Sequence, residues 1–136
     1  MPNGNRPVPQ SLTVLIVDDS AMMRAMIKRV AHLTEIPIAQ VLEAGNGVEA
    51  LQQLEAHAVD VLFTDINMPL MTGPELLREV IKRDEWKHIV RVIVSTDGSA
   101  ARREEMAGLR AHAYLEKPFR PEVMRDVLAQ VVNSGS

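Results

Sequence analysis

The chain has 136 residues, of which 46% are hydrophobic, 24% are charged and only 3% are aromatic. This length and balance predict a single globular domain whose core is built from aliphatic side chains and methionine, with no room for a second folded domain. The net charge of −3 and the pI near 5.8 argue against sequence-independent binding of nucleic acid, which needs a basic face.

The first third of the chain predicts a lead-in, a strand and a helix. Residues 1–11 contain three prolines, a glycine and two asparagines, which indicates a flexible segment. The apolar run 12–17 predicts the first strand, which ends at Asp18 and Asp19. Either acid, or Ser20, can cap the helix that follows. Apolar side chains at three- and four-residue steps predict its core-facing stripe, which consists of Met23, Met26, Ile27, Val30 and Leu33.

A buried strand occupies the middle of the chain. Residues 38–43 predict a weaker second strand, and residues 48–54 a short helix after a glycine-containing turn. The run 59–64 is short and rich in β-branched and bulky apolar residues, which indicates a strand buried on both faces of a parallel sheet. It ends at Asp65. The sequence therefore places Asp65 at the carboxyl edge of the sheet, where open α/β sheets bind their ligands.

The second half continues the alternation of helices and strands. A helix is predicted from Pro74, a residue that suits the first turn of a helix. Residues 89–94 predict a buried strand, 99–109 a helix with a mostly solvated face, and 111–115 a last strand. A final helix begins at Pro121. The apolar stripe of the helix that begins at Pro74 consists of Leu76, Leu77, Val80 and Ile81. The apolar stripe of the helix that begins at Pro121 consists of Met124, Val127, Leu128 and Val131.

Five predicted strands thus alternate with five predicted helices. Such alternation is typical of the α/β class, in which right-handed crossovers cover both faces of one parallel sheet. We expect this domain to span residues 12–132, between the lead-in 1–11 and a frayed tail at 133–136. The chain has no cysteine, no apolar leader, and no run approaching the roughly 18 apolar residues that a membrane span requires. We therefore expect a cytoplasmic protein.

Residues that can carry chemistry follow four of the five strands. They are Asp18 and Asp19 after the first, Asp65 after the third, Ser95 and Thr96 after the fourth, and Lys117 after the fifth. The carboxyl ends of parallel strands share one edge of the sheet. Three carboxylates there repel one another, and this raises their proton affinity unless a cation compensates. Oxygen ligands without histidine or cysteine favour Mg²⁺ as that cation.

A carboxylate, a divalent ion, an ammonium group and a hydroxyl are the components that phosphoryl transfer needs. Each component also has a purely structural explanation when taken alone. Residues 18–20 are typical of a helix cap, and an acid such as Asp65 often forms a turn. Their occurrence together at four strand ends favours a shared site.

Four separated stretches also carry a family resemblance. They are Asp18-Asp19-Ser20 after the first strand, Asp65-Ile66-Asn67-Met68-Pro69 with Gly73, Ser95-Thr96, and Tyr114-Leu115-Glu116-Lys117-Pro118-Phe119. In this order and spacing, they resemble the receiver domain of two-component response regulators, over about Leu12 to Val132. The resemblance implies a doubly wound, flavodoxin-like sheet of strand order 2-1-3-4-5 flanked by five helices. Asp18-Asp19-Ser20 with Met23-Arg24 favours a stand-alone, chemotaxis-type (CheY-like) member.

The resemblance implies a role for each of these side chains. Asp65 would accept a phosphoryl group from a phosphohistidine on a histidine kinase or phosphotransfer protein. Asp19 would bind Mg²⁺ directly and Asp18 mainly through water, together with Asp65 and the backbone carbonyl of Asn67. Lys117 would pair with Asp65 and then with the phosphoryl oxygens, and the peptide bond after it would be cis.

The resemblance also implies a switch. Ser95 would move its hydroxyl onto the phosphoryl group, and Tyr114 would turn into the vacated space. A downstream protein would then bind the altered face of the fourth helix, fifth strand and fifth helix. Asn67 and Asp97 occupy positions that tune hydrolysis of the acyl phosphate, and polar groups there predict a short-lived signal. Arg110 stands where relatives usually have glycine, which predicts strain if its φ is positive.

The leading hypothesis is therefore a signalling domain that catalyses only its own phosphorylation and dephosphorylation. It would act as a monomer or weak dimer, without nucleic acid or membrane. One alternative is a phosphatase with an aspartyl-phosphate intermediate, as in haloacid dehalogenases, but such enzymes place a second acid where Asn67 stands. Another is a receiver-like binding module that no longer accepts phosphate, against which the intact acidic pair, Asp65 and Lys117 argue.

Overall fold

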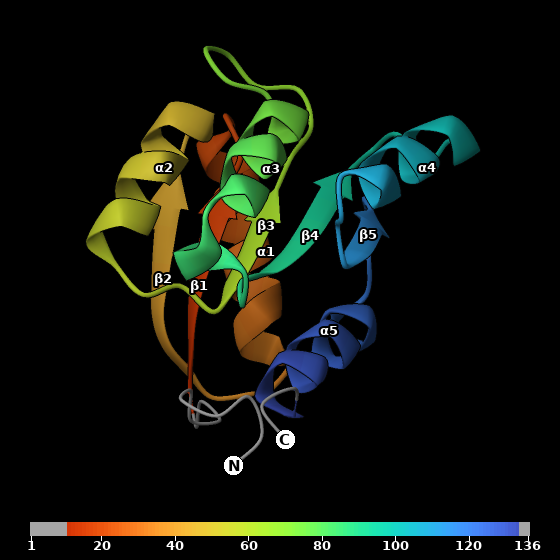
Figure 1. The fold of residues 1–136 in the computed structure, drawn as a ribbon. Coiled ribbons are helices and arrows are strands. Elements are labelled where there is room, and N and C mark those ends of the chain that lie inside the picture. Colours follow the sequence, from red (N-terminus) through yellow and green to blue (C-terminus); the bar gives the residue numbers. More distant parts are fainter. Residues whose placement is uncertain (1–10, 134–136) are drawn as a thin grey trace.

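The computed structural model describes residues 11–133; residues 1–10 and 134–136, which hold most of the predicted lead-in and tail, lie outside the described residues. Five strands and five α-helices alternate along this part of the chain (Figure 1). The strands are β1 (Leu12–Val17), β2 (Ile38–Ala44), β3 (Val61–Thr64), β4 (Val90–Ser95) and β5 (Ala113–Glu116). The helices are α1 (Ala21–Leu33), α2 (Gly47–Ala56), α3 (Gly73–Lys82), α4 (Ala100–Gly108) and α5 (Pro121–Asn133), with a 3₁₀ turn, η1 (Asp84–Trp86).

All strand pairs are parallel, and their order is β2-β1-β3-β4-β5. This confirms the predicted fold class and strand order. The order reverses between β1 and β3, and in open α/β sheets ligands bind at such a reversal. The register pairs Val17 with Thr64, so Asp18 and Asp65 leave the sheet next to each other.

The core has two layers, one on each face of the sheet. Helices α1 and α5 pack on one face, and α2 and α3 on the other (Figure 1). Strand β3 is buried on both faces, as predicted, because Val61 and Phe63 contact the first layer while Leu62 contacts the second. A strand this well packed fixes the position of the residue that follows it, Asp65.

The predicted stripe of α1 is partly wrong. Met26 and Leu33 are 45% and 55% exposed, whereas Ile27 and the small Ala31 are the buried residues of this helix. At about 100° per residue, Met26 and Leu33 point roughly 100° or more away from the direction of Ile27 and Ala31. The apolar residues of α1 therefore cover a wider arc than the face that packs on the sheet.

Polar caps set the start of four helices. Ser20, Asn46, Thr72 and Ser99 each accept a hydrogen bond from a backbone N–H of the first turn, and Thr72 forms a reciprocal capping box with Glu75. Strand β5 begins two residues later than predicted, and α5 includes Asn133, which was expected in the tail. Within residues 11–133, every helix is too short or too polar to cross a membrane.

Candidate functional site

Three carboxylates meet at the carboxyl edge of the sheet. The N–H of Asp65 donates to the carbonyl oxygen of Val17 at 2.9 Å, which continues the β1–β3 pairing one residue beyond the strands. This contact holds Asp65 beside Asp18 and Asp19. One carboxylate oxygen from each acid lies within 4.8 Å of the others. Asp18 is 2% exposed, whereas Asp19 is exposed and Asp65 is half-buried.

Lys117 brings an ammonium group to these acids from the end of β5. Its Nζ lies 3.0 Å from Oδ2 of Asp18 and 3.7 Å from Oδ2 of Asp65. The Lys117 N–H donates to the Ser95 carbonyl oxygen at 2.8 Å, and the Lys117–Pro118 bond is cis, as expected. The expected pairing with Asp65 is present, but the shorter contact is to Asp18. Asp18 is the more deeply buried charge and so gains more from a close counter-charge.

The electrostatics of Asp65 reflect mainly its burial. Burial raises the pKa of this carboxyl group, and the neighbouring charges of Asp18 and Asp19 raise it further. The Ile66 N–H, which donates to its Oδ1 at 2.7 Å, and the Lys117 ammonium act in the opposite direction without cancelling the rise. Burial of Asp65 thus favours its neutral form, and the three acids together face one ammonium group.

A divalent cation fits this arrangement. The group offers carboxylate oxygens only, and hard oxygen ligands suit Mg²⁺ rather than zinc. Asn67, whose backbone carbonyl was predicted as a further ligand, is exposed in the loop two residues after Asp65. The predicted metal-ligating residues thus lie at one edge of the sheet.

The loop after Asp65 folds back onto the main chain of the site. The N–H of Gly73 donates to the Ile66 carbonyl oxygen at 2.8 Å. A Cβ atom at position 73 would lie 2.2 Å from the carbonyl oxygen of Asp65, so only glycine allows this approach. This close approach of Gly73 to the Asp65 main chain was not predicted from the sequence. Its position directly before Pro74, at the start of a helix, was the available signal.

Ser95, Asp97 and Tyr114 form a connected group at the end of β4. Ser95 is 3% exposed, and its Oγ accepts the Asp97 N–H at 3.1 Å. The half-buried Tyr114 donates its hydroxyl to the Asp97 carbonyl oxygen, and the Arg103 guanidinium lies 4.7 Å from the centre of its ring. Hydrogen bonds from Ser99 lower the pKa of the exposed Asp97 carboxyl group. The Tyr114 ring is therefore tied to the β4–α4 loop.

Sequence reasoning missed Arg24 as a residue of this site. Its Nη1 donates to the Asp18 carbonyl oxygen at 2.6 Å, and its Nε donates to Glu43 of β2 at 2.9 Å. Arg24 thereby fixes the backbone of the acidic loop to the neighbouring strand. Its place four residues after Ser20, in the first turn of α1, points back toward that loop.

The chain is similar to known proteins over most of its length. The family model described as "Response regulator receiver domain" matches residues 14–129. The chemotaxis protein CheY1 of Helicobacter pylori is 38% identical over 127 residues, which cover 91% of this chain and 99% of that protein. A chemotaxis protein CheY homolog of Campylobacter jejuni is 39% identical over 128 residues, or 92% and 95% of the two chains. The solved structure of the chemotaxis response regulator CheY4 of Vibrio cholerae superposes with a TM-score of 0.77 at 32% identity, over 89% of this chain and 98% of that one.

Proposed function

This chain belongs to the response regulator receiver domain family, with CheY-type relatives, and we propose that it relays a signal by accepting a phosphoryl group on Asp65. In this proposal, residues 12–132 form the working domain. It acts in the cytoplasm as a monomer or weak dimer. A histidine kinase or phosphotransfer protein supplies the phosphoryl group as a phosphohistidine.

The observation that carries the proposal is the meeting of three carboxylates with one ammonium group. Asp65 is the best placed acceptor of the three acids. Asp18 is nearly inaccessible and already holds Lys117 at 3.0 Å, whereas Asp65 keeps 18% of its side chain exposed and has Lys117 at 3.7 Å. Asp19 is exposed but has no ion pair to Lys117 among those found in residues 11–133.

The proposed phosphoryl transfer requires only small movements of side chains. A carboxylate oxygen of Asp65 forms a bond to phosphorus while the bond from phosphorus to the imidazole nitrogen of the donor breaks, and that nitrogen takes up a proton. Lys117 lies close enough to shift from the carboxylates toward the transferred oxygens. The Ser95 hydroxyl donates to the same oxygens once it releases the Asp97 N–H. Hydrolysis of the acyl phosphate reverses these contacts.

Mg²⁺ is the cofactor in this proposal. The carboxylates of Asp18, Asp19 and Asp65 and the backbone carbonyl of Asn67 would hold it. When bound, it neutralises charge on the acids and on the incoming phosphoryl oxygens. The meeting of three carboxylates with a single ammonium group supports this requirement.

The output is a change in protein binding. Movement of Ser95 breaks its hydrogen bond to the β4–α4 loop, and the same loop holds the Tyr114 hydroxyl. A charge added at Asp65 therefore favours a different arrangement of the loop and the ring, which is a population shift. We place the downstream partner on the surface formed by α4, β5 and α5. Asn67 and Asp97, both polar and exposed, favour rapid loss of the phosphoryl group.

Intact-mass measurement tests this function. The protein is incubated with acetyl phosphate and Mg²⁺, next to Asp65→Asn and a control, Asp84→Asn, whose carboxylate is 90% exposed in η1. The proposal requires a phosphoryl mass gain in the wild type and the control, and none in Asp65→Asn. No gain with any donor would support a phosphorylation-inert binding module, and turnover of a phosphomonoester would support a phosphatase.

A further inference from the structure

A cationic hollow lies at the edge of the sheet opposite the acidic site. Its volume is about 280 Å³, and it is lined by Ile81 of α3, Lys87 after η1, Arg91 of β4 and Arg110 after α4. Arg91 stands near the amino end of β4, whereas Ser95 and the acidic site stand at the carboxyl end. Three of the four lining residues are basic and none is acidic. The hollow is therefore separate from the site of Asp65.

Arg91 carries its charge into this hollow without a carboxylate partner. It is only 7% exposed, and its side chain donates to two main-chain oxygens, from Nε to Arg110 at 3.1 Å and from Nη1 to Ile89 at 2.9 Å. Within residues 11–133, no acid lies within ion-pair distance of Arg91. Burial lowers the pKa of Arg91, and the nearby Arg110 lowers it further. A buried cation of this kind favours an anion beside it.

Arg110 is placed beside Arg91 at a conformational cost. Its φ is 65°, in the left-handed region that glycine enters freely and other residues enter with strain. Its N–H ends α4 by donating to the Ala107 carbonyl oxygen at 2.9 Å, a hydrogen bond that glycine would make equally well. The backbone of this turn thus has no need for the arginine side chain. Strain kept at a position where another residue would relieve it points to a function of the side chain.

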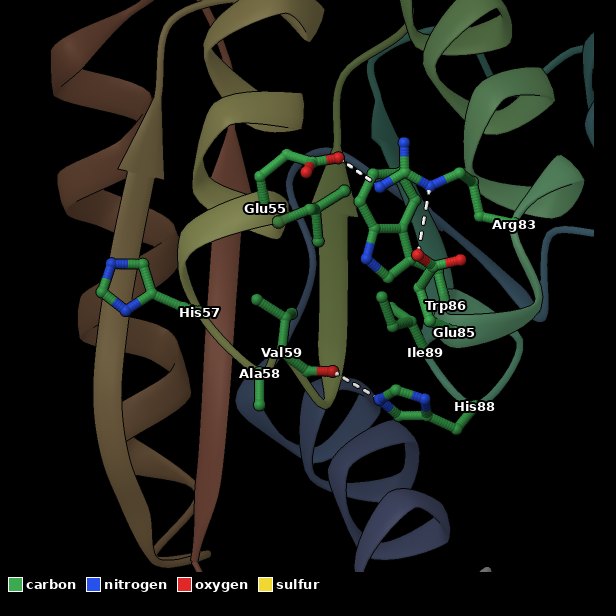
Figure 2. Close-up of a pocket in the computed structure, with 10 residues that line it drawn as sticks. Glu55, His57, Ala58, Val59, Arg83, Glu85, Trp86, His88 and Ile89 are labelled. Carbon is green, nitrogen blue, oxygen red and sulfur yellow. Dashed lines mark hydrogen bonds and ion pairs between the residues drawn. The ribbon is translucent and has the colours of Figure 1, made fainter.

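Another hollow in the same fold contains an arginine, Arg83, whose charge is balanced by acids. Figure 2 shows Arg83 with Glu55 of α2 on one side and Glu85 of η1 on the other, and its guanidinium lies 4.0 Å from the centre of the Trp86 ring. Through these contacts Arg83 links α2 to η1. In the part of the chain that the structure describes, neither Arg91 nor Arg110 has an acid within ion-pair distance.

Lys87, the third cation of the hollow, has only a weak partner. Its ammonium group lies 3.3 Å from Asp84, and the two side chains are 72% and 90% exposed. Exposed pairs of this kind contribute little. Within residues 11–133, two of the three cations, Arg91 and Arg110, therefore have no acid within ion-pair distance, and the third has only this exposed pair.

We propose that the hollow lined by Lys87, Arg91 and Arg110 binds a phosphate group, either as inorganic phosphate or as the phosphate of a small metabolite. Two arginines that line one hollow suit the tetrahedral oxygens of phosphate, since Arg110 can donate paired N–H groups and Arg91 keeps N–H groups beyond the two that it donates to main-chain oxygens. The volume lies just below the usual range for small-molecule sites, roughly 300–1,000 Å³, so the ligand is small.

An NMR titration tests this site directly. Inorganic phosphate is added to ¹⁵N-labelled protein at constant ionic strength, with EDTA in place of Mg²⁺ so that the acidic site does not compete. We expect saturable shifts of the backbone amides of Lys87, Arg91 and Arg110, with those of Asp65 and Asn67 unmoved. Acetate at the same concentration should not reproduce them. Parallel titration with adenosine monophosphate separates the two sources, because tighter binding of the nucleotide identifies a metabolite and tighter binding of phosphate identifies the free ion.

Arg110→Gly is the decisive variant. It removes one guanidinium and also relieves the strained φ, so the fold should become more stable while phosphate affinity falls at least tenfold. Unfolding could then not explain a loss of phosphate binding in this variant. Arg29→Ala, which removes an exposed cation of α1 on the other face of the sheet, is the matched control and should bind like the wild type. Absence of saturable shifts, equal binding of acetate, or wild-type affinity in Arg110→Gly would overturn the proposal.

Discussion

A methyl group at Gly73 is predicted to damage phosphorylation without touching any proposed reacting side chain. In Gly73→Ala, the new Cβ would lie 2.2 Å from the Asp65 carbonyl oxygen and 3.0 Å from the Ile66 Cα. These are main-chain atoms, so no side chain can turn away, and the loop must move by roughly 1 Å to reach an ordinary contact. Overpacking of this kind costs about 1–3 kcal/mol of unfolding free energy. Displacement of a reacting group by about 1 Å can slow a reaction roughly 100-fold.

Two measurements check this prediction, a urea denaturation curve and the initial rate of phosphorylation by acetyl phosphate with Mg²⁺. Gly108→Ala is the control, because no heavy atom lies within 4 Å of its added Cβ. At that helical position alanine should leave the rate unchanged and add up to about 1 kcal/mol of stability. The reasoning is refuted if Gly73→Ala retains both the stability and the rate of the wild type.

Three further predictions concern the charges of the site. Burial raises the pKa of the Asp65 carboxyl group above 3.8, so the folded state holds this proton more tightly than the unfolded state, and stability is lost as pH rises from about 4 through the folded pKa. Asp65→Asn should therefore raise the urea midpoint at pH 7 and raise it less near pH 4. An equal gain at both pH values would contradict this. In thermal melts, Mg²⁺ at 100 times its Kd should stabilise the wild type by about 2.7 kcal/mol. Asp19→Asn should reduce this stabilisation, and the control Asp84→Asn should retain it. Equal stabilisation of the wild type and both variants would exclude Asp19 as a ligand. Lys117→Met leaves the buried Asp18 unpaired and should cost about 3–5 kcal/mol. Adding Asp18→Asn should recover part of this loss in a double-mutant cycle, whereas strictly additive effects would mean that the pair is not coupled.

The fold was predictable because its strongest signals are local. Strand β3 carries an uninterrupted buried run, and the apolar stripes predicted for α3 and α5 are mostly buried. In α1 the pattern failed at Met26 and Leu33, because periodicity identifies an apolar arc but not the part of the arc that meets the sheet. Trp86 and its 3₁₀ turn were not predicted, since a three-residue element has too few residues to show a period.

The positions of the site residues were predictable for a related reason. Parallel strands bring their carboxyl ends to one edge, so residues after β1, β3, β4 and β5 had to meet there. What the sequence did not contain was the detail set by side-chain packing. Lys117 lies nearer to Asp18 than to Asp65, Arg24 reaches the Asp18 carbonyl, and Gly73 contacts the main chain of Asp65. The first depends on two strand ends that lie far apart in the chain, and the other two depend on how a loop folds against the helix that follows it.

The burial of Arg91 was equally beyond sequence reasoning. A charged residue within the apolar run of β4 gives no sign of its partners, and these turn out to be main-chain oxygens from the end of α4 and from the residue before the strand. Arg110 was noticed in the sequence only as a departure from glycine. The positive φ and the neighbouring Arg91 give that departure a physical consequence.

The proposed function is tested most directly by identifying which carboxylate takes the phosphoryl group. The protein is phosphorylated with acetyl phosphate and Mg²⁺, the acyl phosphate is reduced with borohydride, and peptide mass spectrometry locates the resulting homoserine. We expect homoserine at position 65, with Asp18 and Asp19 unchanged. Homoserine at position 18 or 19, or recovery of unmodified Asp65 from protein that has gained a phosphoryl group, would contradict it.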